Sequence, residues 1–190
     1  MKNLFALLLV SALLGCSTTH LIEVDFPAPL VPALPVEARG VFSEEFSNYR
    51  FEQTEDDRSD MTVILGEAHT DLFRTIFVVI FDNYTEAGEA ASGLTLQPEL
   101  LAFQYALPGE TGSNFYEVWL RYRLQVRSGE QQVADWQLSG YGRAANETMQ
   151  TQGAGVNGAT EEALRDIGTQ LAIGFAQQTD IQAWLREQNP

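Results

Sequence analysis

The most regular hydrophobic pattern in the chain covers residues 115–127 and predicts a β-strand. Apolar and polar side chains alternate strictly there, so one face of the strand should be buried and the other wetter. The apolar series is Tyr116, Val118, Leu120, Tyr122, Leu124 and Val126, and the other series is Glu117, Trp119, Arg121, Arg123, Gln125 and Arg127. A turn at residues 128–130 and a returning strand at 131–141 would complete a hairpin. An earlier strand is expected within residues 94–107.

Two segments show the spacing of amphipathic helices. The first has its apolar face at Leu72, Phe73, Ile76, Phe77, Ile80 and Phe81, widened by Val78 and Val79. The second is expected to begin at Thr160, a good N-cap residue, with its buried stripe at Ala163, Leu164, Ile167, Leu171 and Phe175. A final short helical turn is predicted at residues 180–187, with Trp184 as its apolar anchor.

The remaining pattern completes an α+β domain. Residues 36–51 predict a strand with an irregular extension, residues 52–60 a polar loop, and residues 61–65 a short strand that ends at Gly66. The order is therefore strand, helix, several antiparallel strands and helix. It predicts a two-layer sandwich, with a mostly antiparallel sheet and two helices on one face. A chain of 190 residues has room for one such domain, which we place at residues 36–190.

The first fifteen residues have the pattern of a secretory signal. A short start that contains Lys2 precedes an apolar run at residues 4–14, which is about half the length that spans a bilayer. The sequence Leu13-Leu14-Gly15-Cys16 resembles the lipobox of bacterial lipoproteins, and Cys16 is the only cysteine in the chain. The resemblance implies that residues 1–15 are removed and that Cys16 is acylated, which anchors the protein to a membrane.

The resemblance also implies a location. Ser17 follows the cysteine, and in bacterial lipoproteins a residue other than Asp at this position is typical of the outer membrane. Residues 16–35 are expected to be a lipidated N-terminus and a proline-rich tether, since prolines favour extended polyproline II structure. The tether is itself apolar, so part of it could instead lie against the domain. The domain would then be held on the periplasmic side.

The charge of the chain excludes one class of partner. The formal net charge is −15 at pH 7, and Lys2 is the only lysine. An acidic chain of this kind should repel nucleic acids and anionic headgroups. We interpret the acidity as an aid to solubility or as an adaptation to a salty habitat.

Several motifs that could carry chemistry are better explained as structure. Residues 153–158 match the G-x-G-x-x-G pattern of dinucleotide sites, but the preceding residues are polar and no buried strand leads into them. We interpret them as a flexible loop before the second helix. His69 is expected at the surface of the first helical turn, and no cluster of metal ligands is visible. With no nucleophile and base set, the sequence predicts no catalytic residue, no metal and no cofactor.

One surface is a candidate for a partner. Trp119, Arg121 and Arg123 share the less apolar face of the long strand, and Trp and Arg are common in binding hot spots. The alternative, which we favour, is that the arginines pair with acids such as Glu117 or Asp135.

The lipobox and the order of elements together are similar to accessory lipoproteins of the Gram-negative envelope. These include auxiliary lipoproteins of ABC-type transport systems and the lipopolysaccharide-assembly lipoprotein. Outside the lipobox the similarity covers residues 36–178 as an order of elements, so no binding residue is carried over. It implies a non-catalytic accessory or scaffold subunit of an envelope complex. A binding module for a lipid or glycan, with a cleft between helices and sheet, is the alternative.

Overall fold

The computed structural model describes residues 18–54, 60–86, 93–147 and 151–188. Cys16 and the rest of the predicted signal and lipobox lie outside these residues. So do most of the predicted loop at residues 52–60 and part of the segment before the last long helix. Among the described residues, no helix is both long and apolar enough to cross a membrane.

Three long antiparallel strands form a meander at the centre of the fold and confirm the predicted hairpin and the earlier strand. They are β6 (Leu94–Ala106), β7 (Phe115–Ser128) and β8 (Gln131–Ala145). The predicted apolar face of β7 is buried along its whole length, from Tyr116 to Val126. Gly129 turns the chain between β7 and β8 with φ of +56°, a conformation that glycine adopts without strain. The hairpin is longer than predicted, because β8 continues four residues past Tyr141.

Two shorter strands extend this sheet at the β6 edge and make it mixed. The strand order is β5-β2-β6-β7-β8, in which β2 (Leu34–Gly40) runs parallel to both β5 (Phe81–Thr85) and β6. A second sheet has the order β1-β4-β3. Its strands are β1 (Thr18–Leu21), β4 (Met61–Ile64) and β3 (Arg50–Gln53).

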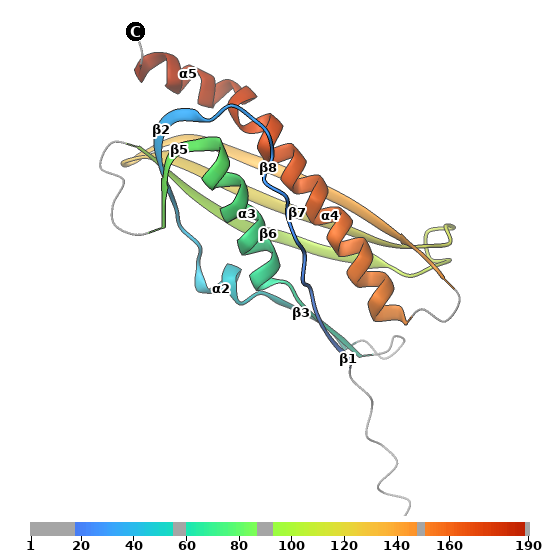
Figure 1. Cartoon of the computed structure of the whole chain (residues 1–190). Coiled ribbons are helices and arrows are strands. Elements are labelled where there is room, and N and C mark those ends of the chain that lie inside the picture. The colour runs from blue at the N-terminus through green and yellow to red at the C-terminus, as the bar shows by residue number, and fades with distance from the viewer. Residues whose placement is uncertain (1–17, 55–59, 87–92, 148–150, 189–190) are drawn as a thin grey trace, which may run out of the picture.

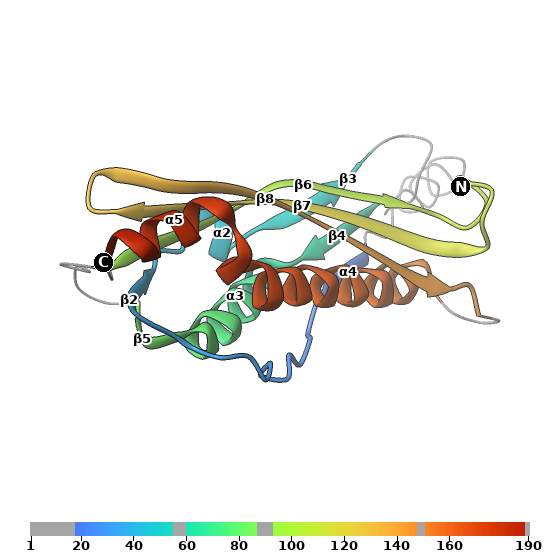
Figure 2. The same ribbon diagram turned by 90° about the horizontal axis from the view of Figure 1, so that it is seen from above.

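The helices lie on one side of the long meander, so the α+β class and the layer arrangement are as predicted (Figures 1 and 2). More than the two predicted helices are present. They are α2 (Glu44–Ser47), α3 (Gly66–Ile80), α4 (Gln152–Gly174) and α5 (Thr179–Gln188), with a 3₁₀ turn at Phe175–Gln177. Trp184 of α5 is buried, as predicted, and α5 packs against β8.

Helix α3 buries the predicted stripe against the sheet. Leu72, Phe73 and Phe77 are fully inaccessible to solvent, and Phe73 also contacts the ring of Tyr122 on β7. Val78 does not widen this stripe as predicted, because it is 56% exposed. Its position on the helix faces away from the sheet, beyond the reach of the core. Phe81 is buried, but it belongs to β5, where the chain leaves the helix.

Helix α4 begins nine residues earlier than predicted. Thr151 is its N-cap, and the Thr151 hydroxyl accepts a hydrogen bond from the Ala154 backbone N–H at 3.2 Å. Thr160 is buried inside the helix, where its hydroxyl donates to the Val156 carbonyl at 2.7 Å. The glycine-rich residues 153–158 are therefore helix, not a flexible loop. Their small size is needed for packing, since a methyl group on Gly155 would overlap the ring of Tyr116.

Two glycines of β8 allow α4 to lie very close to the sheet. A methyl group on Gly142 would overlap the backbone of Ala159 and Ala163 in α4, and Gly140 also faces the Ala163 carbonyl. Helix α4 in turn covers the outer edge of β8. The Asp166 carboxylate accepts from the Tyr141 backbone N–H at 3.1 Å, and the Gln170 amide donates to the Ser139 carbonyl at 2.8 Å. This edge is thus protected from pairing with another strand.

Replacing Gly142 by alanine should therefore lower the free energy of unfolding by about 1–3 kcal/mol, because the added methyl group meets helix backbone that can yield only if α4 shifts. Urea unfolding followed by circular dichroism measures the change. Gly158→Ala is a matched control, since its methyl group would meet only the Ala144 methyl, at 3.2 Å. Equal losses in the two variants would show that the close approach of α4 to β8 is not the cause.

The segment interpreted as a tether takes part in the fold. Residues 18–21 pair with β4 in parallel, with Thr18 opposite Met61 and Leu21 opposite Ile64. Ile22 is 2% exposed, and Phe26 and Val31 pack against the core. Residues 22–33, which we name the strap, then cross the outer side of the helix layer between α3 and α4 to reach β2 (Figures 1 and 2). The strap lies on the helices because burial removes apolar surface of Ile22, Phe26 and Val31 from water, which lowers the free energy of the folded state.

Candidate functional site

The outward face of the β6–β7–β8 meander is the surface that the sequence singled out. Trp119 on β7 lies opposite Tyr141 on β8 and Gln104 on β6. Arg121 lies opposite Ser139 and Ala102 in the same way. The face points away from the helices, because the all-apolar side of each strand is the one that packs on α3 and α4. The alternation of apolar and polar side chains along β7 was enough to predict which of its faces points outward.

Trp119 and Tyr141 form an exposed aromatic pair on this face. Their ring centroids are 5.6 Å apart with a tilt of 39°, and their exposed fractions are 36% and 41%. A shallow hollow of about 380 Å³ lies over them. It is lined by Ala102, Gln104, Trp119, Leu120, Arg121, Ser139, Gly140 and Tyr141. We name this surface the aromatic hollow.

A buried carboxylate fixes one side of the aromatic hollow. The Tyr141 hydroxyl donates to Glu117 Oε1 at 2.6 Å, and Glu117 Oε2 accepts from Ser113 at 2.9 Å and from Thr111. These hydroxyl groups, Thr111 first, hold the pKa of Glu117 below its usual value. The hydrogen bond to the carboxylate raises the pKa of Tyr141. The tyrosine ring is therefore held in place before any partner arrives, which lowers the entropy lost on binding.

The arginines of this face divide into paired and open ones. Arg123 lies 3.4 Å from Glu99 and 3.5 Å from Asp135, so here the predicted internal pairing is found. Within the part of the chain that the structure describes, Arg121 has no acid within ion-pair distance, and it is exposed. Arg143 lies over the ring of Phe115 at 4.9 Å. The open positive charge beside the aromatic hollow is thus that of Arg121, and Arg123 is largely compensated.

His69 is not at the surface, contrary to the prediction. It is completely buried, and its ring stacks on Phe46 with the centroids 3.7 Å apart. Its Nε2 lies 2.5 Å from the Phe46 carbonyl and its Nδ1 3.2 Å from the Tyr122 hydroxyl. A carbonyl only accepts, so Nε2 carries the proton and Nδ1 accepts from Tyr122. Both nitrogens are occupied, and the ring is a structural link between α2, α3 and β7.

The other candidate motifs can be placed in the same way. Gly153 and Gly155 pack against His20 and Tyr116, so the G-x-G-x-x-G residues have no open loop in which to hold a pyrophosphate. Across residues 18–54, 60–86, 93–147 and 151–188, no three His, Cys, Asp or Glu side chains form a group that could hold a metal ion. Glu44 and Glu45 are exposed in the first turn of α2.

A second hollow, on the opposite side of the molecule, was not predicted. It lies between the strap, α3 and α4, and has a volume of about 480 Å³. It was not predicted because the strap was interpreted first as a tether, and packing against the domain was only the alternative. The sequence does contain an indication of this hollow, since Phe26, Leu30 and Val31 are bulky apolar residues in a segment that was expected to be exposed to solvent.

The architecture defines an α+β sandwich with its helices on one face of a mixed sheet. A search of solved structures finds this fold in a Xanthomonas campestris protein of family DUF330. The two chains are 15% identical with a TM-score of 0.57, over 91% of this chain and 100% of the other. At this identity the likeness establishes a shared fold.

Two more distant structures are similar to parts of the chain. A candidate lipoprotein from Caulobacter crescentus is 11% identical with a TM-score of 0.47, over 80% of this chain and 93% of its own. A minor lipoprotein from Acinetobacter baumannii is 9% identical with a TM-score of 0.40, over 74% and 93%. No protein-family model matches the sequence, and no curated protein matches it significantly.

Proposed function

We propose that this chain is an outer-membrane lipoprotein, anchored through acylated Cys16, that acts as a non-catalytic accessory or scaffold subunit of a cell-envelope complex. The observation that carries the proposal is the aromatic hollow. It presents two exposed aromatic rings and an open arginine on a rigid sheet, at the side opposite the helices. Such residues anchor protein partners, whereas isolated exposed polar residues do not.

The anchor is supported by the sequence around Cys16 and by the direction of the chain after it. Leu13, Leu14 and Gly15 provide the lipobox, and Thr18 enters the fold two residues after the cysteine. A lipid at Cys16 would therefore hold the domain close to the membrane instead of at the end of a long tether. The domain would then contact its partner complex near the membrane surface.

Mass spectrometry of the protein extracted from membranes should find Cys16 acylated at the amino terminus. Cys16→Ser should leave a precursor that is not cleaved after Gly15, or a soluble product, because the thiol is the group that receives the lipid. Ser17→Ala is the control and should be processed normally. A Cys16→Ser protein that is cleaved and membrane-bound like the wild type would contradict the assignment.

The double variant Trp119→Ala, Arg121→Ala should lose the proteins that the wild type co-purifies from gently solubilised membranes. The partner should present an acidic group to Arg121 and an apolar group to the two rings. Loss of the aromatic pair should cost the fold about 0.5–1.5 kcal/mol in addition to the apolar area that Trp119 buries, and circular dichroism should still show a native domain.

The matched control is Val78→Ala, Arg186→Ala, which removes an exposed apolar residue and an exposed arginine from the helix layer. It should retain the co-purified proteins. A folded Trp119 and Arg121 variant that keeps its partners would place the docking surface elsewhere on the domain.

A further inference from the structure

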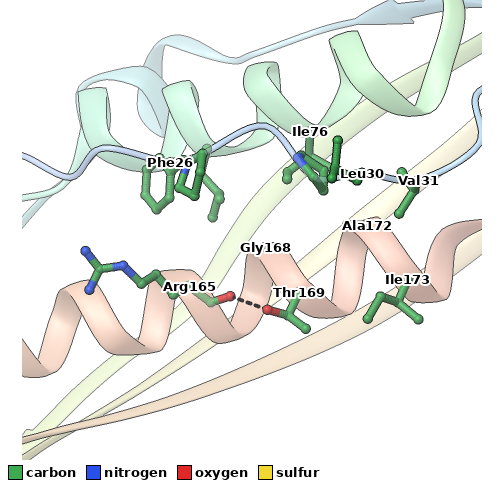
Figure 3. A pocket seen from close by; sticks show the side chains of 12 residues that line it. Phe26, Leu30, Val31, Ile76, Arg165, Gly168, Thr169, Ala172 and Ile173 are labelled. Atoms are coloured by element: carbon green, nitrogen blue, oxygen red, sulfur yellow. Dashed lines mark hydrogen bonds between the residues drawn. The ribbon is translucent and has the colours of Figure 1, made fainter.

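The hollow between the strap and the helices is an elongated slot with chemically different ends (Figure 3). Arg165, Thr169 and Ile173 recur every four residues along one face of α4, so the row from Arg165 to Ile173 spans roughly 12 Å of helix axis. Arg165 brings a charged guanidinium at one end. Ile173, with Leu30 and Val31 of the strap, makes the other end wholly apolar.

Small residues of α4 create the space. Gly168 is buried, and a methyl group there would come within 2.9 Å of Leu72 on α3. Ala172 is the next small residue of α4 in the wall of the slot. Leu72 and Ile76 of α3 therefore form the floor of the slot, next to the small residues of α4. The volume of about 480 Å³ lies in the range of pockets that bury small molecules, about 300–1,000 Å³.

Apolar side chains are exposed at the mouth of the slot. Leu30 is fully exposed and Ile173 is 57% exposed, and both line the hollow. An apolar ligand would shelter parts of these side chains from water and would be stabilised in proportion to the area covered. Pro27, Pro29 and Pro32 of the strap have no backbone N–H, so these three positions present no donor toward such a ligand.

The chain as a whole is acidic and should repel anionic headgroups, but Arg165 places a positive charge at this end of the slot. The Thr169 hydroxyl already donates to the Arg165 carbonyl at 2.9 Å, so it is not free to donate to a ligand. The Arg165 guanidinium contacts Glu162 at 3.1 Å and Glu161 at 3.6 Å, in pairs that are open to solvent. Exposed pairs of this kind contribute about 0–1 kcal/mol, so an anionic headgroup can compete for the guanidinium. A carboxylate or a phosphate would suit it.

We propose that this slot binds one acyl chain of an anionic single-chain amphiphile, a fatty acid or a lysophospholipid. Its head lies at Arg165 and its chain runs toward Ile173, beneath the strap. The proposed occupant is a free molecule, because the acyl chains linked to Cys16 carry no anionic head that could pair with Arg165. His20, four residues after that cysteine, packs against Gly153, which is roughly 18 Å along α4 from Arg165. This inference is independent of the aromatic hollow and of any protein partner.

The test uses the full chain, purified from membranes and placed in phosphatidylcholine vesicles. A palmitate that carries a photoreactive diazirine is added and irradiated, and the labelled peptides are identified by mass spectrometry. Label is expected on the peptides that contain Leu30 and Ile173. Ala172→Phe fills the slot, and Ile173→Asp places a charge at its apolar end. Both should reduce this label about tenfold or more, while thermal unfolding stays near that of the wild type.

Two further measurements test the contact between the head group and Arg165, and compare two kinds of head group. Arg165→Ala should reduce the label about tenfold, because a charge-assisted contact is lost. Unlabelled palmitate and lysophosphatidylglycerol are then compared as competitors, and the better competitor shows whether the site prefers a carboxylate or a phosphate head. Val78→Phe, an apolar change outside the slot, should label like the wild type. Equal labelling in the wild type, Ala172→Phe and Ile173→Asp, or label on other peptides alone, would overturn the proposal. So would an Arg165→Ala protein that labels normally.

Discussion

Phe77→Ala should lower the free energy of unfolding by about 3–5 kcal/mol, because the side chain is wholly buried and its removal leaves a cavity that rigid neighbours cannot fill. Those neighbours are themselves aromatic. The rings of Phe73, Phe81 and Tyr84 lie with their centroids 5.8, 6.4 and 5.9 Å from that of Phe77. The loss is large in relation to the stability of a single domain, which is about 5–15 kcal/mol.

The measurement is urea unfolding of a soluble form that begins at Ser17. A form beginning at Val36, the predicted domain boundary, would lack β1 and the buried Ile22 and would be an unsuitable reference. Val78→Ala is the matched control, since it shortens the next side chain on the same helix at a 56% exposed position. It should change the unfolding free energy by no more than about 0.5 kcal/mol. A similar loss in both variants would mean that the buried face of α3 is wrongly assigned.

The meander could be predicted because its strands obey a strict period of two. One face of β7 carries only apolar side chains from Tyr116 to Val126, and no other structure buries such a series on one side. The pairing of Trp119 with Tyr141 could not be predicted. It depends on the register between β7 and β8, which shifts at a bulge between Val126 and Arg127. Alternation gives the face of a strand but not its neighbours across the sheet.

The start of α4 was missed because local propensity was overridden by packing. Gly153, Gly155 and Gly158 each disfavour a helix by about 1 kcal/mol relative to alanine. The helix forms nevertheless, since these positions lie against His20, Tyr116 and Ala144, and two of them leave no room for a side chain. A single sequence does not show which neighbours a glycine will meet, so the same residues were interpreted as a loop.

The strap was interpreted first as a tether, with packing of part of it against the domain as the alternative, and His69 was placed at the surface. Prolines exclude helix and central strand, but they do not exclude an extended segment that lies on a hydrophobic surface. For His69 the decisive partner is the carbonyl of Phe46, which is 23 residues away in sequence. A histidine can be buried once such an acceptor is present. Its sequence context, close to Glu67 and Asp71, pointed to solvent.

The burial of His69 predicts a loss of stability in mild acid. Desolvation lowers its pKa from 6.5 to about 4 in the folded protein, against a smaller upward effect of the hydrogen bond to Phe46. Burial raises the pKa of Tyr122, so that hydroxyl stays protonated and continues to donate to Nδ1. Folding therefore holds the imidazole neutral over a pH range in which the unfolded chain binds a proton.

The sign follows from the number of protons bound. Between pH 6.5 and pH 4 the unfolded state binds more protons at this residue, so stability rises with pH and falls as the solution is acidified. At about 1.4 kcal/mol per pKa unit, about 2 kcal/mol is lost at pH 5 and about 3 kcal/mol at pH 4, and the loss is complete only below pH 4. Above pH 6.5 the contribution of His69 should be constant.

Comparing the wild type with His69→Gln separates the contribution of His69 from that of the many carboxylates, because both proteins contain the same other titrating groups. Glutamine keeps a donor for the Phe46 carbonyl but has no charge to gain in acid. Urea unfolding at pH 7.5 and pH 5 should show the wild type losing about 2 kcal/mol more than the variant over that interval. Equal losses would mean that His69 is protonated in the folded protein. In that case the imidazole would have to donate from both nitrogens, and the hydrogen bond with the Tyr122 hydroxyl would run in the opposite direction.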